Sequence, residues 1–272
     1  MTAPVLPRAV GSPLARVEAR AKVTGEARFA YEYAPDRLAY CTPVQATIAR
    51  GEVRGVDASA ALERRGVLAV IWADNAPRLA DAGDGELALF QSRGVAYRGQ
   101  IVAAVVAETF EIAREATGLV RVAYDEQPHD VLLRGDHPKL YKPDVVNPSF
   151  PTDTEQGDPD GALASAPVSL DVTYRTPAFH NHPMEPHASV AVWEGDGLTL
   201  YDSNQGVSSV QRTLSKLFEL DPSQVRVISP HVGGGFGSKG AAHPDVILAA
   251  MAARLVPGRP VKLALTLSLI HI

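Results

Sequence analysis

The stretch His231-Val-Gly-Gly-Gly-Phe-Gly-Ser-Lys-Gly240 carries five glycines within eight residues, counted from Gly233. Glycine has no side chain to hold a ligand away from the backbone, so the N–H groups of this loop can contact an anion or an oxo group directly. A β-branched run at 225–229 precedes the loop, and an apolar stretch with helical periodicity at 244–255 follows it. The expected local order is therefore strand, glycine-rich loop, helix.

The spacing within this loop separates it from two common nucleotide-binding loops. A P-loop requires serine or threonine directly after a Gly-Lys pair, whereas here the serine precedes Lys239 and a glycine follows it. Gly235, Gly237 and Gly240 match the G-x-G-x-x-G fingerprint of dinucleotide-binding loops. That fingerprint also needs an acidic residue about 20 positions later to bind a ribose, and no Asp or Glu follows Asp245. A plain surface turn explains one or two glycines but poorly explains three in succession.

Segments in both halves of the chain share a pattern with one enzyme family. Gly233–Lys239 resembles the GGGFGGK loop of the molybdenum hydroxylases, the xanthine dehydrogenase and aldehyde oxidase family. Ser203–Gly206 is similar to the family's Ser/Thr-x-Gln segment, and Met184–Trp193 to the beginning of a strand in its bacterial aldehyde-oxidising members. Three further segments resemble its α/β hammerhead domain: Ala21–Phe29, Gly66–Val70 and Gly99–Glu108. The resemblance extends from about Ala15 to Thr266.

This resemblance implies a fold and an activity. The fold is α+β, with an N-terminal α/β hammerhead domain followed by the first part of a molybdopterin-binding α+β domain. The activity is that of a molybdenum-cofactor-binding large subunit that hydroxylates aldehydes, or N-heteroaromatic rings, with water as the oxygen source. Electrons would pass to partner subunits, one with iron–sulfur clusters and one with FAD. The alternative is a non-catalytic glycine-loop module that binds a nucleotide or a protein partner.

The resemblance also implies which residues bind the cofactor. Gln205 is assigned to the oxo ligand of molybdenum through its side-chain amide, and Phe236 and Gly237 to the cofactor through backbone N–H groups. A buried amide and two fixed N–H dipoles can stabilise negative charge on oxygen in a dry site. Molybdenum needs no protein ligand, because the pterin dithiolene holds it, and the catalytic glutamate base of the family is expected beyond residue 272. The full set of expected cofactor-binding residues is Gln205, Gly233, Gly234, Gly235, Phe236 and Gly237.

Other expectations concern the substrate, the cofactor and the compartment. Purine-oxidising members of the family carry glutamate directly after the loop lysine, where this chain has Gly240, so aldehydes are expected rather than xanthine. The cofactor is expected in the cytosine dinucleotide form that bacterial relatives commonly use. Lys239 either screens a cofactor phosphate or is simply solvated. The expected compartment is the cytoplasm, or the periplasm if a partner subunit with a twin-arginine signal exports the complex.

Composition places limits on the function. The 272 residues are 46% hydrophobic, which is typical of a globular protein, and a net charge of −5 gives no strong field for nucleic acid or acidic membranes. No apolar run approaches the roughly 18 to 20 residues that span a bilayer, and the first residues lack the apolar core of a signal peptide. The single cysteine, Cys41, excludes a disulfide framework and a four-cysteine iron–sulfur site. Cys41 itself is expected to be a buried structural thiol.

The histidine cluster at 180–187 raises the possibility of a zinc site. His180, His182 and His187 lie close together in the sequence with Glu185 between them, but their spacing fits no closed four-ligand pattern. We expect a structural role for Glu185 and His187 at the start of the next strand, where polar groups commonly satisfy local backbone atoms.

The chain is expected to divide into a tail (1–14), a hammerhead domain (15–127), a proline-rich connector (128–160) and part of a molybdopterin-binding domain (161–272). Helices are predicted at 57–66, capped by Asp57 and stopped by Gly66, at 110–119 behind a Thr109 cap, and at 208–218. Strands are predicted at 67–72, 101–107, 120–124, 169–175, 188–193 and 198–202, with a hairpin turn at 194–197 and a βαβ-like unit in the N-terminal half. The ending Leu267–Ile272 departs from the family pattern, which suggests a truncation or a reading-frame artefact and an incomplete, inactive second domain.

Overall fold

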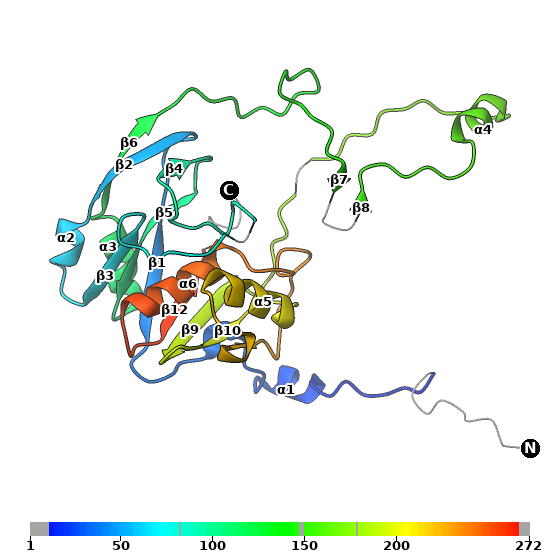
Figure 1. Cartoon of the computed structure of the whole chain (residues 1–272). Helices are drawn as coiled ribbons and strands as arrows, with labels where there is room; N and C mark the ends of the chain where they lie inside the picture. The colour runs from blue at the N-terminus through cyan, green and yellow to red at the C-terminus, as the bar shows by residue number, and fades with distance from the viewer. Residues whose placement is uncertain (1–10, 82, 147–149, 178, 267–272) are drawn as a thin grey trace, which may run out of the picture. The chain divides into compact units, whose positions relative to one another are not determined.

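The computed structural model describes residues 11–81, 83–146, 150–177 and 179–266. The chain forms two compact units, and the larger one combines the segment up to Pro128 with the segment from His180 onward (Figure 1). The smaller unit is His129–Phe179. The predicted α+β class is confirmed, because the chain combines helices with sheets whose strands pair mostly antiparallel. The predicted domain boundaries and the suggested artefact at 267–272 stay predictions, and the latter lies outside the described residues.

A seven-stranded sheet is the centre of the larger unit, with the order β11-β10-β9-β12-β1-β5-β3. The strands β9 and β10 form the predicted hairpin, in which Glu194 pairs with Gly197. Parallel pairing of β1 with β12, from Ala39 opposite Val261 to Cys41 opposite Leu263, joins strands of the two predicted domains into one sheet. The bounds are β1 Ala39–Gln45, β3 Val67–Trp72, β5 Ile101–Ala107, β9 Ala188–Glu194, β10 Gly197–Asp202, β11 Val225–Ile228 and β12 Val261–Ala264.

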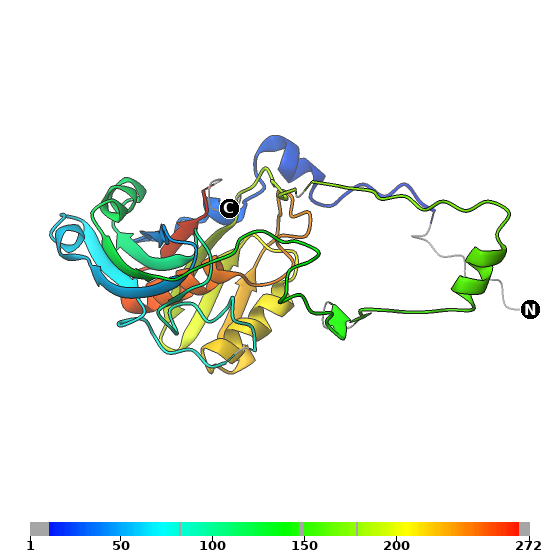
Figure 2. The same cartoon turned by 90° about the horizontal axis from the view of Figure 1, so that it is seen from above.

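Two helices pack beside the C-terminal strands of this sheet, α5 (Val207–Leu217) and α6 (Pro244–Leu255) (Figures 1 and 2). The helix α6 is apolar on nearly every side and almost wholly buried, and it begins at a proline, which the first turn tolerates. The indole N–H of Trp193 in β9 donates to the carbonyl oxygen of Ala250 at 2.9 Å, which fixes α6 on the sheet. The main hydrophobic core therefore lies between α5, α6 and the sheet.

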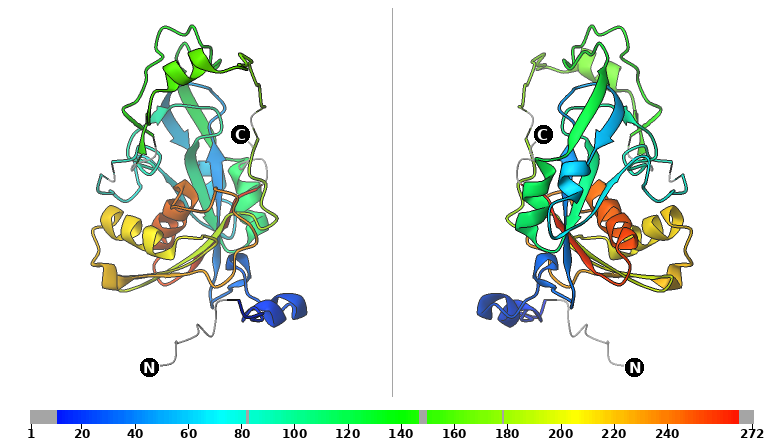
Figure 3. Two further views of the ribbon diagram at one scale, coloured as in Figure 1. Left: turned by 90° about the vertical axis from the view of Figure 1, so that its right-hand side faces the viewer. Right: turned by 90° about the vertical axis from the view of Figure 1, so that its left-hand side faces the viewer.

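The N-terminal half of the larger unit adds a three-stranded sheet, β4-β2-β6 (Figure 3). Its strands are β2 Gly51–Asp57, β4 Gly94–Val95 and β6 Arg121–Glu126. The helix α3 (Phe110–Thr117) is capped by the Thr109 hydroxyl, which accepts the N–H of Ile112 as predicted. Short helices are α1 Ala19–Thr24, α2 Ser59–Leu62, and the 3-10 turns Ala30–Glu32 and Pro222–Gln224.

The smaller unit contains little regular structure. It has a two-stranded ribbon, β7 (Val145–Val146) with β8 (Phe150–Pro151), and the helix α4 (Pro159–Ser165), whose cap Asp158 accepts the N–H of Gly161 at 2.9 Å. The strand predicted at 169–175 is wrong: these residues form no strand, and their apolar side chains are exposed. Alternation alone does not make a strand where no neighbouring backbone pairs with it.

Two details of the N-terminal half differ from the predictions. The helix predicted at 57–66 spans only Ser59–Leu62, because the Asp57 carboxylate accepts both the N–H and the hydroxyl of Ser59 and closes a turn ahead of the helix. The βαβ-like unit is wrong, since β3 and β5 pair antiparallel and β6 lies in the other sheet.

The buried thiol at Cys41 is confirmed, and burial raises its pKa far above the usual value. None of the helices in the described ranges is long and apolar enough to cross a bilayer.

Candidate functional site

The glycine-rich loop joins β11 to α6, which confirms the predicted order of strand, loop and helix. Its tip is a turn in which the N–H of Ser238 donates to the carbonyl oxygen of Gly235 at 2.9 Å. Phe236 and Gly237, the two central residues, have φ values of +52° and +99°, as in a type I′ turn. A phenylalanine with positive φ is uncommon, and this one is 74% exposed. The loop therefore holds a bulky residue in an unfavourable conformation at its surface.

The turn leaves two backbone donors free. In the described residues, neither the N–H of Phe236 nor that of Gly237 donates to a protein acceptor, and both residues are exposed. Successive free N–H groups in a left-handed turn form a concave donor site for an anion or an oxo group. The side-chain amide of Asn181 donates to the carbonyl oxygen of Phe236 and so helps to hold the turn.

Gln205 lies against this loop, between the end of β10 and the start of α5. Its backbone N–H donates to the carbonyl oxygen of Lys239 at 2.8 Å. A Cβ added to Gly235 would meet the side-chain Oε1 of Gln205 at 2.5 Å, so glycine is required there for the glutamine to approach. The structure thus brings Gln205 and the glycine loop together. Gln205 is exposed in the described chain, not buried as the sequence argument assumed, although Ser203 and Asn204 just before it are buried.

The other loop glycines are required by packing or by conformation. A Cβ on Gly233 would lie 2.6 Å from the Cβ of Glu185. Gly234 has a φ of +101°, and a Cβ added to it would lie 3.0 Å from the ring of Phe236. Gly240, by contrast, has open space around it. The roles of these residues towards a cofactor stay predictions, but the cradle they form is a property of the loop itself.

Lys239 is buried, so the expectation of a solvated lysine is wrong. Only 1% of Lys239 is exposed, and its ammonium group lies 2.9 Å from Oε2 of Glu185. The same ammonium donates to the backbone carbonyl oxygen of Glu185 at 2.8 Å, and the N–H of Gly233 donates to Oε2 at 2.7 Å. These contacts give Glu185 a structural role at the start of β9.

The buried His187 and Asp245 lie near the half-buried His243, close to the end of the loop. His187 donates from Nε2 to the carbonyl oxygen of Ser238 at 2.9 Å, and its ring is 6.3 Å from that of His243. Burial raises the pKa of Asp245, and the nearby His187 and His243 partly oppose this. Within the described ranges, no three His, Cys, Asp or Glu side chains are arranged to hold a metal ion. The sequence argument missed Asp245, although a charged residue in the first turn of an apolar helix was a visible signal.

Asp202, at the end of β10, gives a pH-dependent test of this buried group. Burial, with the neighbouring Asp245, raises its pKa from 3.8 to about 6, although Ser189 and Asn204 donate to it. The folded state therefore binds more protons than the unfolded state between these two values, so Asp202 makes stability fall as the pH rises from about 4 to 6. In Asp202→Asn, we expect the free energy of unfolding to decrease over this pH range by on the order of 1–3 kcal/mol less than in the unaltered protein. Urea unfolding across the range measures the difference.

The matched control is Asp196→Asn, which changes an exposed carboxylate in the β9–β10 turn and is expected to leave the slope unchanged. An unaltered pH slope in Asp202→Asn would contradict the raised pKa.

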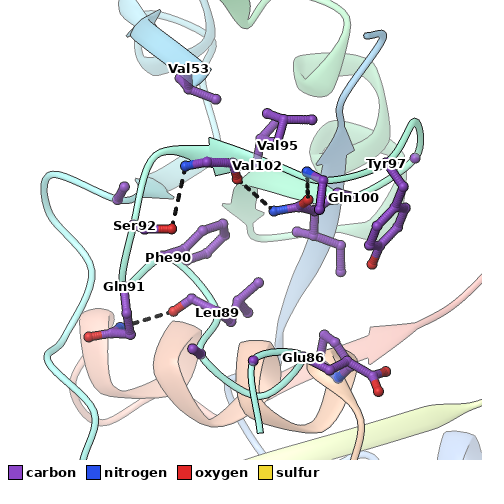
Figure 4. A pocket seen from close by; sticks show the side chains of 18 of the residues that line it. Val53, Glu86, Leu89, Phe90, Gln91, Ser92, Val95, Tyr97, Gln100 and Val102 are labelled. Carbon is purple, nitrogen blue, oxygen red and sulfur yellow. Dashed lines mark hydrogen bonds between the residues drawn. The ribbon is translucent and has the colours of Figure 1, made fainter. Parts of the chain in front are cut away.

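A cavity of about 1100 Å³ adjoins the loop at Ser238. Ser238, His187 and Asn181 contribute to its wall, and apolar side chains from the 85–102 segment form much of the rest (Figure 4). Its glutamines are held by the backbone: Gln100 donates to the carbonyl oxygen of Gly94 and Gln91 to that of Leu89, each at 2.9 Å. Nothing in the sequence pattern predicted this cavity, because it depends on contacts between distant segments.

Comparison with known proteins identifies the class of protein. Residues 24–128 match the family model of the aldehyde oxidase and xanthine dehydrogenase a/b hammerhead domain, and residues 140–269 match that of the molybdopterin cofactor-binding domain. The chain belongs to the aldehyde oxidase and xanthine dehydrogenase family of oxidoreductases, as the loop and Gln205 segments indicated. The predicted hammerhead and cofactor-binding folds are confirmed, and the matches do not support the non-catalytic alternative.

Three relatives illustrate the similarity. The aldehyde oxidoreductase molybdenum-binding subunit PaoC of Escherichia coli K12 is 41% identical over 261 residues, covering 95% of this chain and 35% of PaoC. The structure of quinoline 2-oxidoreductase from Pseudomonas putida 86 superposes with a TM-score of 0.76 at 22% identity, over 93% of this chain and 34% of that one. The aldehyde oxidoreductase from Desulfovibrio gigas gives a TM-score of 0.70 at 25% identity, over 92% and 30% respectively. The chain thus spans about a third of the length of these relatives.

Proposed function

We propose that this chain is the molybdenum-cofactor-binding part of an aldehyde oxidoreductase subunit. The observation that carries the proposal is the contact between Gln205 and Gly235 beside the two free N–H groups of Phe236 and Gly237. One side-chain amide lies beside a surface turn with two free backbone donors, and this set of groups suits the oxo and anionic groups of a molybdenum–pterin cofactor. The 41% identity to PaoC, a molybdenum-binding subunit by name, supports the same proposal.

The chain's own residues bind and orient the cofactor. When bound, the cofactor supplies the two-electron oxidation of the substrate carbon, with oxygen derived from water. Gln205 presents its amide from a backbone fixed by the N–H···O bond to Lys239, so little reorganisation is needed on binding. The left-handed turn presents the N–H groups of Phe236 and Gly237 before the cofactor arrives, and such preorganised donors are the most effective kind. The glutamate base is proposed to lie outside this chain.

Partner subunits are needed to remove the electrons. The single cysteine is buried in β1, so this chain cannot ligate an iron–sulfur cluster through four thiolates. We propose an iron–sulfur subunit and an FAD-binding subunit as partners, and molybdopterin cytosine dinucleotide as the cofactor form. The complex works in the cytoplasm, or in the periplasm if a partner's twin-arginine signal exports it.

The decisive experiment uses the complete complex with its partner subunits. Molybdenum measured by elemental analysis, together with an extracted pterin, is expected in about one equivalent per chain. A complex that contains neither, although all subunits are present, would contradict the proposed function.

Gly240 predicts the substrate preference. Resemblance places this residue where purine-oxidising relatives carry a glutamate, and a site without that carboxylate loses a specific polar contact to a purine. We therefore expect the complete enzyme to oxidise aromatic aldehydes with a kcat/KM at least about 10²-fold above that for xanthine, measured by steady-state kinetics. Because the space around Gly240 is open, Gly240→Glu is expected to fold normally and to reduce this ratio. Efficient xanthine turnover by the unaltered enzyme would disprove the assignment.

A further inference from the structure

One side chain, Glu185, ties together both ends of the glycine-rich loop. At the start of the loop, the N–H of Gly233 donates to its Oε2 at 2.7 Å, and the N–H of Glu185 donates back to the carbonyl oxygen of Gly233 at 3.3 Å. At the end of the loop, Lys239 Nζ lies 2.9 Å from the same Oε2 and donates to the Glu185 carbonyl oxygen at 2.8 Å. Glu185 precedes these residues by 48 and 54 positions, so the fold alone brings them together.

The burial of this pair is unusual among the ion pairs of the described residues. The Lys239 side chain is 0% exposed and that of Glu185 9%, whereas the Arg64–Glu115 pair, also at 2.9 Å, is about half exposed. Within the described part of the chain, the second carboxylate oxygen of Glu185, Oε1, is buried without a hydrogen-bond partner. Burying two charges removes their hydration, and an unsatisfied acceptor adds to that loss, so apolar side chains of similar volume often stabilise a fold as well or better. Stability alone does not account for this pair.

The pair does account for the geometry of the site. The turn with Phe236 and Gly237 lies between the two anchor points, and the carbonyl oxygen of Lys239 accepts the backbone N–H of Gln205 at 2.8 Å. Fixing Lys239 therefore fixes the loop end and Gln205 together. We infer that Glu185 and Lys239 are a positioning pair, which sets the relative placement of Gln205 and the Phe236–Gly237 turn for the cofactor. This inference rests on the proposed function, and it adds two residues that do not themselves touch the cofactor.

The test uses the complete complex with the double substitution Glu185→Leu and Lys239→Met. Because both charges are removed together, the variant is expected to fold with a thermal midpoint at or above that of the unaltered protein. Molybdenum and pterin per chain are expected to fall at least about tenfold, and amide hydrogen exchange in residues 233–239 to accelerate at least about tenfold. Glu185→Gln keeps an acceptor for Gly233 and is expected to retain most of the cofactor.

The matched control is the exposed pair, changed as Arg64→Met with Glu115→Leu, for which cofactor content and loop exchange should be unaltered. Normal loading and normal loop exchange in the Glu185–Lys239 double variant would overturn the inference. Failure of that variant to fold would also overturn it, because the pair would then serve stability. If the unaltered complex holds no molybdenum, the proposed function fails, while the hydrogen-exchange result still decides whether the pair positions the loop.

Discussion

Gly235→Val in the complete enzyme is expected to lower the molybdenum and pterin content at least about tenfold while leaving the fold intact. A Cβ at this position would lie 2.5 Å from Oε1 of Gln205 and 3.0 Å from its Cδ, and valine adds two further methyl groups. The clash falls on the end of a flexible side chain, so Gln205 moves away and the protein still folds. The loss is measured by elemental analysis and pterin extraction, with the thermal midpoint recorded in parallel.

The control is Gly55→Val, which adds a side chain in open space on β2 and is expected to load normally. To show that the contact with Gln205 causes the loss of cofactor, Gly235→Ala and Gln205→Ala are made singly and together. Removing the glutamine amide relieves the 2.5 Å contact, so the double variant should bind more cofactor than Gly235→Ala alone. If Gly235→Val carries a normal amount of pterin, the loop is only a turn.

Gln205→Ala is expected to reduce kcat on the order of 10²-fold or less in enzyme that still contains molybdenum. The substitution removes the side chain beyond Cβ, and the amide is its only polar group, while the backbone N–H to Lys239 stays in place. Loss of one preorganised donor has this magnitude when the donor acts mainly in the transition state, and kcat and kcat/KM then fall together. Activity is expressed per molybdenum, so that poorer loading does not enter the comparison.

Gln211→Ala provides the matched control for a lost glutamine. Its amide donates to the carbonyl oxygens of Pro222 and Val225, at 3.0 and 2.8 Å, and so only holds α5 to its neighbours. We expect a lower thermal midpoint and an unchanged kcat per molybdenum. Unchanged kinetics in Gln205→Ala would refute the role of the Gln205 amide.

Local sequence patterns correctly predicted the helices and strands that are apolar enough to be buried in any fold. The strand β5 is apolar throughout and the helix α6 is apolar from Val246 to Ala253, so each must be buried wherever the chain goes, and both have the predicted bounds. The strand predicted at 169–175 failed because a strand depends on a partner that its own alternation does not supply. The parallel pairing of β1 with β12 was unpredictable for the same reason.

The candidate site was predicted in part. Resemblance and glycine spacing indicated that Gln205 and the loop act together, and the Gln205 side chain does lie against Gly235, where a Cβ would clash with it. The burial of Lys239 was not predicted, since a lysine at the end of a polar loop is ordinarily hydrated. Its partner, Glu185, lies 54 positions away, and no local pattern links two residues over such a distance. The free N–H groups at Phe236 depend on a left-handed backbone conformation, which phenylalanine seldom adopts.

The pairing of β1 with β12 sets an order of events during protein synthesis. One edge of β1 pairs with the antiparallel strand β5, which is synthesised about sixty residues later. The other edge pairs with β12, which begins at Val261, more than 200 residues after Ala39. A nascent chain therefore carries an unpaired strand edge while the ribosome makes more than 200 further residues, and such edges readily pair with other chains. At roughly 5–20 residues per second, this interval lasts on the order of ten seconds or more. Slow closure of one strand pair thus lengthens the time during which the newly made chain can associate with other chains before any cofactor is inserted.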